Sequence, residues 1–249
     1  MLGRFLEISV YAPDVVESLA FYESLGFVQA MTGDTWTHPY AVVTDGRLFL
    51  GLHQYRFPSP SLTWVQPDLE RHLEPLRQLG VRFEFERLGA DVFNEAGFTD
   101  PHGQIVTLLE ARTFSPPDLS PGYSSACGDF AEYALPARSF DAGREFWESL
   151  GFVALLDEDS PFPRLTLASD HLNVALYRTR ALRGPVLAFE ASDMGQRIEQ
   201  LRERGHRLGD EMPDGLDERR NATLTAPEGT QLLLLDLPAE DGDRGTLAH

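Results

Sequence analysis

The chain has 249 residues, and 42% of them are hydrophobic, which is enough to build a sizeable core. Its formal net charge of −18 would repel nucleic acid phosphates and anionic membrane surfaces, so we expect neither as a partner. No apolar run approaches the roughly 20 residues of a membrane span, and the first residues do not form a signal peptide, so we expect a cytoplasmic protein.

The chain opens with a strand and an amphipathic helix. Residues Phe5–Val10 alternate in polarity, which predicts a strand with Glu7 and Ser9 on its more polar face. Asp14 begins a capping-box pattern, and Gly26 follows the last apolar residue at helical spacing. A helix between these two residues follows.

Further extended and helical runs complete two β-α-β-β-β motifs in the first half of the chain. Their polarity and turn residues predict strands at 27–31, 40–44, 47–55, 61–65, 83–87, 94–99 and 104–110, and a helix at 68–79 that contains Pro75.

The second half repeats the first. Ser18–Phe27 reads SLAFYESLGF, and Gly143–Phe152 reads GREFWESLGF 125 positions later, so the chain is a tandem duplication. In the second copy we expect strands at 131–135, 165–168, 171–178, 186–190 and 231–237, a helix capped by Ser139, and a helix carrying Ile198 and Leu201. We expect a first unit at 1–114, a linker at 115–125, a second unit at 126–238 and an acidic tail at 239–249.

Three signatures occur in both units: the strand that leads into the repeated helix, a Leu-Gly helix end at Gly80 and Gly205, and a turn before the last strand. With them the chain resembles the vicinal oxygen chelate superfamily of glyoxalase I, extradiol dioxygenases, fosfomycin-resistance enzymes and bleomycin-binding proteins. The resemblance implies an α+β fold of paired β-α-β-β-β modules, each pair curling its sheet around a cup. It also implies one divalent metal held by inward side chains on four strands, and several chemistries within the family.

Carried over residue by residue, the four metal positions contain few metal-binding side chains. They fall on Glu7 and Glu132, on Gly51 and Asn173, on Leu62 and Leu187, and on Thr107 and Leu233. One carboxylate in each unit is fewer than the three protein ligands of typical catalytic metal sites. We therefore expect no cofactor, although a divalent metal stays an alternative, with Glu7, His53 and Glu132 as fallback ligands.

The two glutamates are the candidate catalytic or ligand-orienting groups, because a carboxylate buried in an apolar cup can act as a base or as a recognition group. Each could instead pair with an arginine or lie hydrated. Aromatic residues including Trp36 and Tyr40 could line the cups or simply form the core. The expected ligand-binding residues are Glu7, Ser9, Gly51, His53, Trp64, Thr107, Glu132, Asn173 and Phe189.

These residues support three functional hypotheses. The first is a metal-free cup that binds a small, largely apolar or aromatic metabolite or antibiotic, in a monomer or homodimer. The second is an enzyme, a lyase, isomerase or dioxygenase that uses divergent metal ligands or glutamate acid–base catalysis. The third is a structural or dimerising protein whose cups are filled by Leu62, Leu187 and Leu233.

Overall fold

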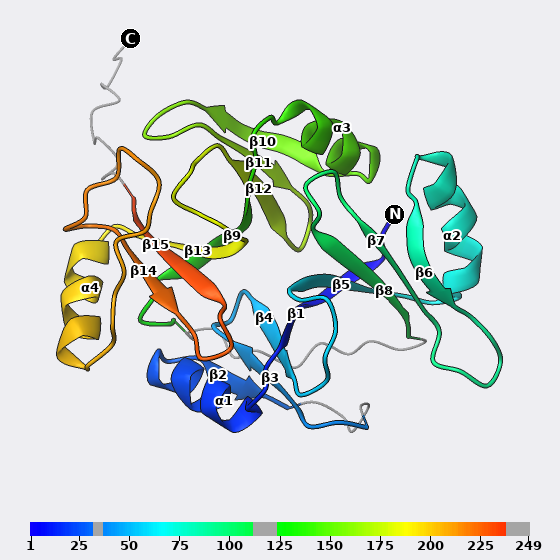
Figure 1. Ribbon diagram of the computed structural model, residues 1–249, viewed down its shortest axis with the longest axis horizontal. Coiled ribbons are helices and arrows are strands. Elements are labelled where there is room, and N and C mark those ends of the chain that lie inside the picture. The colour runs from blue at the N-terminus through cyan, green and yellow to red at the C-terminus, as the bar shows by residue number, and fades with distance from the viewer. Residues whose placement is uncertain (32–36, 112–123, 238–249) are drawn as a thin grey trace, which may run out of the picture.

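The computed structural model describes residues 1–31, 37–111 and 124–237 (Figure 1). The described residues form two mixed β-sheets, of eight and seven strands, and four α-helices. The predicted linker, all of it except 124 and 125, and the predicted tail lie outside the described residues, as does Trp36.

The first unit forms the eight-stranded sheet, in the order β2-β3-β4-β1-β5-β8-β7-β6. Strands β1 and β5 pair antiparallel and join its two β-α-β-β-β motifs. The elements are β1 (Arg4–Tyr11), α1 (Val15–Ser24), β2 (Val28–Ala30), β3 (Tyr40–Thr44), β4 (Phe49–His53), β5 (Ser61–Gln66), α2 (Leu69–Gln78), β6 (Phe83–Arg87), β7 (Glu95–Thr99) and β8 (Ile105–Glu110).

The second unit forms the seven-stranded sheet, in the order β10-β11-β12-β9-β13-β15-β14. It has no described counterpart of β6, and an isolated bridge between Gly209 and Thr223 lies beside β14. The elements are β9 (Asp129–Pro136), α3 (Asp141–Ser149), β10 (Val153–Glu158), β11 (Arg164–Ala168), β12 (Asn173–Tyr177), β13 (Val186–Ala191), α4 (Met194–Glu203), β14 (Ala222–Thr225) and β15 (Gln231–Asp236). The predicted α+β fold of paired modules is confirmed.

The repeated helices begin differently and end alike. The Asp14 carboxylate accepts hydrogen bonds from the backbone N–H groups of Val16 and Glu17, both at 3.0 Å, as the capping pattern predicts. The prediction for Ser139 is wrong: α3 begins after Phe140, and no side chain caps it. Both helices lead into a glycine in the left-handed region, Gly26 at φ 89° and Gly151 at φ 97°, where a side chain would be strained.

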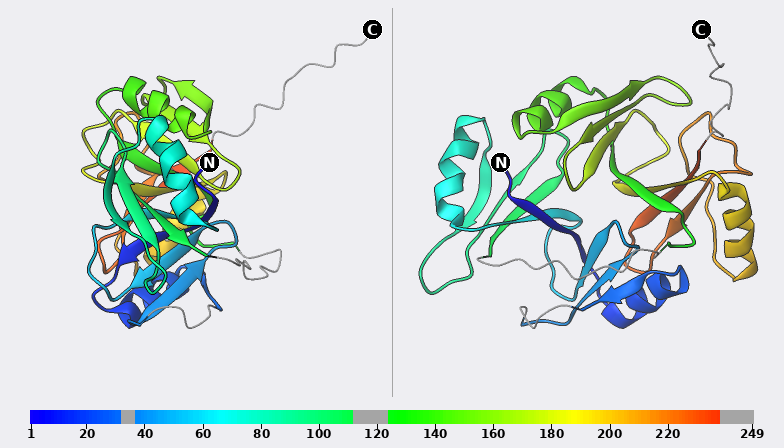
Figure 2. Two further views of the ribbon diagram at one scale, coloured as in Figure 1. Left: turned by 90° about the vertical axis from the view of Figure 1, so that its right-hand side faces the viewer. Right: turned by 180° about the vertical axis from the view of Figure 1, so that it is seen from behind.

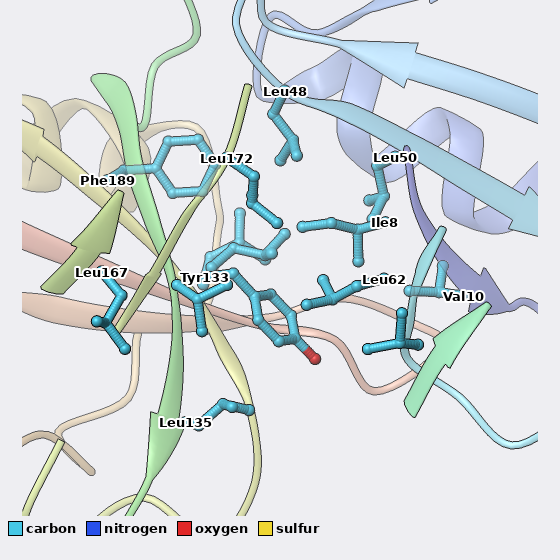
Figure 3. Close-up of a cluster of buried hydrophobic side chains, with 14 of the residues drawn as sticks. Ile8, Val10, Leu48, Leu50, Leu62, Tyr133, Leu135, Leu167, Leu172 and Phe189 are labelled. Atoms are coloured by element: carbon cyan, nitrogen blue, oxygen red, sulfur yellow. The ribbon is translucent and has the colours of Figure 1, made fainter. Parts of the chain in front are cut away.

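One hydrophobic core joins the two units. Ile8, Val10 and Leu50 from the first sheet meet Tyr133 and Phe189 from the second (Figure 3). Each of these five side chains is no more than 2% exposed, so apolar surface removed from water holds the sheets together.

 Phe27, just before β2, adds to this contact: it is 3% exposed, and its ring centroid lies 6.0 Å from that of Phe189.

The first helix of each unit, α1 or α3, also contacts the other unit (Figures 1 and 2). The Tyr22 hydroxyl on α1 donates to Glu228, in the turn between β14 and β15, at 2.7 Å. At the equivalent place, the Trp147 indole on α3 donates to Asp100, in the turn between β7 and β8, at 3.2 Å. Tyr22 and Trp147 are 125 positions apart, so the duplicated helices make matching contacts across the interface.

Among the described helices, none has both the length and the apolar character needed to cross a membrane.

Candidate functional site

The face of the first sheet opposite the core is lined with polar side chains. Because β1 alternates, Ile8 and Val10 enter the core while Glu7 and Ser9 point to the other face. In register, Glu7 pairs with Thr63 on β5, and Thr63 pairs with Thr107 on β8. We call this face the first cup.

Glu7 is only 1% exposed and is the centre of a buried hydrogen-bond network. One carboxylate oxygen accepts from the Ser9 hydroxyl and lies 2.8 Å from His53 Nε2. The other oxygen accepts from the Tyr40 hydroxyl at 2.5 Å. Ser9 in turn lies 2.8 Å from the Thr63 hydroxyl. These bonds compensate a buried carboxylate for its lost hydration.

Gly51 gives this carboxylate its space. It is the β4 partner of Ser9, and a Cβ atom built on it would lie 2.1 Å from Glu7 Oε1. A Cβ atom so close to an oxygen would clash with it, so the observed position of the Glu7 side chain requires glycine at residue 51. Gly51 therefore shapes the first cup without offering a side chain to it.

A second histidine extends the network. His38 Nε2 lies 3.1 Å from His53 Nδ1, and the His38 ring stacks on Tyr55. Partial burial, and then the neighbouring His53, lower the pKa of His38, so its ring is neutral at pH 7. His53 thus lies between two partners, with Glu7 on Nε2 and His38 on Nδ1.

A cavity of about 200 Å³ opens over this network. One wall is polar, and there the Ser61 and Thr107 hydroxyls lie 2.7 Å apart. The opposite wall is apolar and includes Phe85, whose ring lies so close over Gly97 that a Cβ there would be 2.1 Å from it. The described lining residues are Ser9, His38, His53, Tyr55, Phe57, Pro58, Ser61, Thr63, Glu84, Phe85, Glu95, Phe98, Ile105, Thr107 and Leu109.

The corresponding face of the second sheet, which carries Glu132, is the second cup. It has the same plan, but apolar side chains fill it. Glu132 accepts from the hydroxyls of Thr166 at 2.6 Å and Tyr177 at 2.5 Å, and it lies 3.9 Å from Arg164. Over it lies a cluster of apolar side chains, each no more than 8% exposed. The cluster is Ala134, Phe162, Ala175, Tyr177, Leu182, Val186, Ala188, Met212, Leu233 and Leu235.

The pairing of strands shows how the two cups correspond. Tyr40 pairs with His53 on β3 and β4, and Arg164 pairs with Tyr177 on β11 and β12. Both second-unit residues lie 124 positions after their counterparts. Tyr177 and Arg164 of the second cup therefore stand where the first cup has His53 and Tyr40. Both cups have a glutamate, but the side chains that contact it differ.

The structure brings together four of the residues that the sequence predicted: Glu7, Ser9, His53 and Thr107 contact one another or line one cavity. Glu132 lies in the other cup. Its predicted alternative, pairing with an arginine, has a counterpart in the Arg164 contact.

Three other predicted placements are corrected. Trp64 and Phe189 belong to the core between the units, on the face opposite the cups. Asn173 donates to the backbone oxygen of Ala131 at 3.0 Å, and the true counterpart of Gly51 is Ala175, which pairs with Ala134 as Gly51 pairs with Ser9.

The third metal position is also displaced by one residue. Leu62 and Leu187 lie in the core, whereas Thr63 and Ala188 face the glutamates. In the register, Ile8 pairs with Leu62 and Glu7 pairs with Thr63, so simple alternation along β5 places Leu62 in the core and Thr63 in the cup. Alternation from Ser61 would have indicated Ser61 and Thr63, but the family positions pointed to Leu62 instead. Tyr40 was expected only as one of several aromatic residues, and no local sequence signal marks the role of Phe57 and Phe85.

The corrected positions do not fit a catalytic metal. The row in the first cup is Glu7, Thr63 and Thr107, and the row in the second contains a single carboxylate. Within the described ranges, no group of three or more His, Cys, Asp and Glu side chains is arranged to hold a metal ion, so Glu7, His53 and Glu132 do not form one site.

A larger cavity, of about 340 Å³, lies between the units and includes Tyr11, Tyr133 and Glu228. Loop segments around Pro60, Pro185 and Gly229 form much of its lining. Both Glu228 oxygens already accept hydrogen bonds from α1, so this cavity offers fewer available polar groups than the first cup.

No family model matches the chain, and no curated protein matches it. Solved structures do. A variant of homoprotocatechuate 2,3-dioxygenase from Brevibacterium fuscum is 15% identical over 97% of this chain and 74% of its own, with a TM-score of 0.58. A catechol 2,3-dioxygenase is 12% identical over 95% and 90%, with a TM-score of 0.57.

The chain has the vicinal oxygen chelate fold. A third structure, of BphC, a halotolerant catechol dioxygenase, agrees at 14% identity over 94% of this chain and 86% of its own, with a TM-score of 0.57. At these identities the likeness extends to the fold, and the side chains of the cups decide the chemistry.

Proposed function

We propose that the chain binds a small single-ring molecule in the first cup, without a catalytic metal. The observation that carries the proposal is the cavity of about 200 Å³ between the Ser61 and Thr107 hydroxyls and an apolar wall. A protein cavity of about 150 Å³ holds a benzene molecule, whereas drug-sized ligands occupy sites of roughly 300 Å³ or more. A one-ring metabolite matches this size better than a large antibiotic does.

The contrast between the cups supports the same proposal. At the position of Thr107 the second cup carries Leu233, which belongs to the cluster that fills it. The dioxygenases of similar fold are named for homoprotocatechuate and catechol, which are one-ring compounds. Glu7, Thr63 and Thr107 lie side by side on three strands, and hydroxyls and histidines line the cavity; these groups favour recognition of a ring by hydrogen bonds over binding of a metal.

The test is a panel of one-ring and two-ring compounds, measured by thermal shift and calorimetry on the wild-type chain. We expect one-ring compounds alone to raise the melting temperature, because a ligand at 100 times its Kd adds about 2.7 kcal/mol of stability. Thr107→Leu introduces the residue of the second cup and should abolish binding. Thr225→Leu, on an exposed position of β14, is the matched control and should leave binding unchanged.

Two results would contradict the proposal. One is a wild-type chain that binds no member of the panel. The other is a Thr107→Leu variant that folds and binds with unchanged affinity, since the ligand would then lie elsewhere.

The hydrogen-bonded chain from His38 through His53 to Glu7 favours a second candidate function, metal-free acid–base catalysis. Both histidines line the cavity, and the contact with Glu7 fixes the orientation of the His53 ring. A ligand found in the panel should then be converted or exchange a proton for deuterium, as followed by NMR. Loss of exchange in His53→Gln with retained binding would support catalysis; identical exchange rates would exclude it.

A further inference from the structure

Acidic side chains line the cavity of the first cup. Two carboxylates, those of Glu84 and Glu95, lie among the described lining residues of the cavity, and no arginine does. Glu95 pairs with Arg87 at 2.8 Å, whereas the Glu84 carboxylate accepts a hydrogen bond from the neutral Thr99 hydroxyl. Glu84 therefore leaves a negative charge at the mouth of the cavity.

Beneath the cavity the same sign continues. The hydrogen bonds of Glu7 come from two hydroxyls and from His53, and no arginine pairs with it in the described part of the chain. Glu132 differs, because Arg164 lies 3.9 Å from its carboxylate. Among the described residues, the first cup thus keeps the carboxylate without the arginine that accompanies it in the second.

The remaining wall is aromatic. Tyr55 and Phe85 are 58% and 43% exposed, which is unusual for rings of this size, and both line the cavity together with Phe57. The guanidinium of Arg56, which lies between Tyr55 and Phe57 in the chain, packs instead over the ring of Tyr11, 5.3 Å from its centroid, and Tyr11 lines the cavity between the units. Aromatic faces beside carboxylates attract organic cations through the ring quadrupole and the negative charge together.

We propose that the first cup selects a one-ring organic cation, a compound that carries a protonated or quaternary amine. This inference rests on the proposed function, since it names the ligand class of the same cavity. The amine lies toward Glu84 and the aromatic wall, and the ring lies against Ile105 and Leu109. The formal net charge of −18 attracts such a cation over long distance as well.

The experiment compares three compounds of nearly equal size at pH 7: benzylamine as the cation, benzyl alcohol as the neutral analogue and benzoate as the anion. Calorimetry should give a Kd for benzylamine at least about tenfold below that of benzyl alcohol, and no binding of benzoate. Added salt should weaken the binding of benzylamine but not that of benzyl alcohol, because salt screens charges at the solvent-exposed mouth of the cavity.

Glu84→Gln should raise the Kd of benzylamine about fivefold or more while leaving that of benzyl alcohol unchanged. Glu86→Gln is the matched control: Glu86 lies on the same strand but binds Arg77 of α2, so its removal should change neither affinity. Equal or tighter binding of benzyl alcohol or benzoate would overturn the cation assignment and leave the proposed function standing. If none of the three compounds binds while another one-ring member of the panel does, the cation assignment alone fails; if no member of the panel binds, both fail.

Discussion

A single methyl group at Gly51 should break the network of the first cup. The Cβ of Gly51→Ala would lie 2.1 Å from Glu7 Oε1, 2.3 Å from Cδ and 2.5 Å from Oε2. The carboxylate must therefore leave its place and lose its bonds to Ser9, His53 and Tyr40. Each such bond to a charged group contributes about 1.5–3 kcal/mol.

The three losses are not additive, because the donors share one acceptor and some of them can rebond. We expect the free energy of unfolding to fall by about 3–5 kcal/mol, a large part of the roughly 5–15 kcal/mol that a domain has. Urea unfolding followed by circular dichroism measures this change. Gly184→Ala is the control, because nothing lies within 4 Å of a Cβ there; its effect should stay within about 1 kcal/mol.

A second background decides whether the clash is the cause. In a Glu7→Ala chain the added methyl meets no carboxylate, so Gly51→Ala should cost less than about 1 kcal/mol there. The reasoning is refuted if the loss in the wild-type background is below about 1 kcal/mol, or if the full loss persists after Glu7 has been removed.

Three further changes test other parts of the structure. Glu228→Ala leaves two buried hydroxyls of α1 without an acceptor and should lower the free energy of unfolding by about 2–4 kcal/mol in urea titrations. Tyr177→Phe removes a hydrogen bond from buried Glu132 and should cost about 1–3 kcal/mol by the same assay. Burial raises the pKa of the Cys127 thiol from 9.0 to about 12. Because the unfolded thiol ionises first as pH rises above 9, stability is lost with rising pH, by at most about 1.4 kcal/mol per pH unit from this group. Cys127→Ala should therefore flatten the decline between about pH 9 and 10, and an unchanged slope would contradict this cause.

The fold could be predicted from the sequence because independent local signals agree. The repeated decapeptides gave the period, and alternation along β1 gave the face of Glu7. Turn glycines such as Gly26 and Gly151 marked the helix ends. Ser139 shows the limit of such signals, because a residue suited to capping does nothing when the helix begins two positions later.

The candidate site could be predicted only along single strands. Glu7, Ser9 and His53 were found because each lies on a strand with clear alternation, whereas positions across strands depend on register. Thr63, not Leu62, lies opposite Glu7 in the register of β1 and β5, and the residues of one strand do not show which residue of the next strand lies opposite. One residue fewer in the second unit likewise hid Tyr177 as the counterpart of His53.

The filled second cup sets the stoichiometry of any ligand that the first cup takes. Phe162, Met212 and Leu233 occupy the space where a second molecule would lie. A titration should thus end at one molecule per chain and follow a simple hyperbola, with a Hill coefficient of about 1. Duplication here doubles the framework without doubling the binding capacity, so any sigmoidal response would have to come from contact between separate chains.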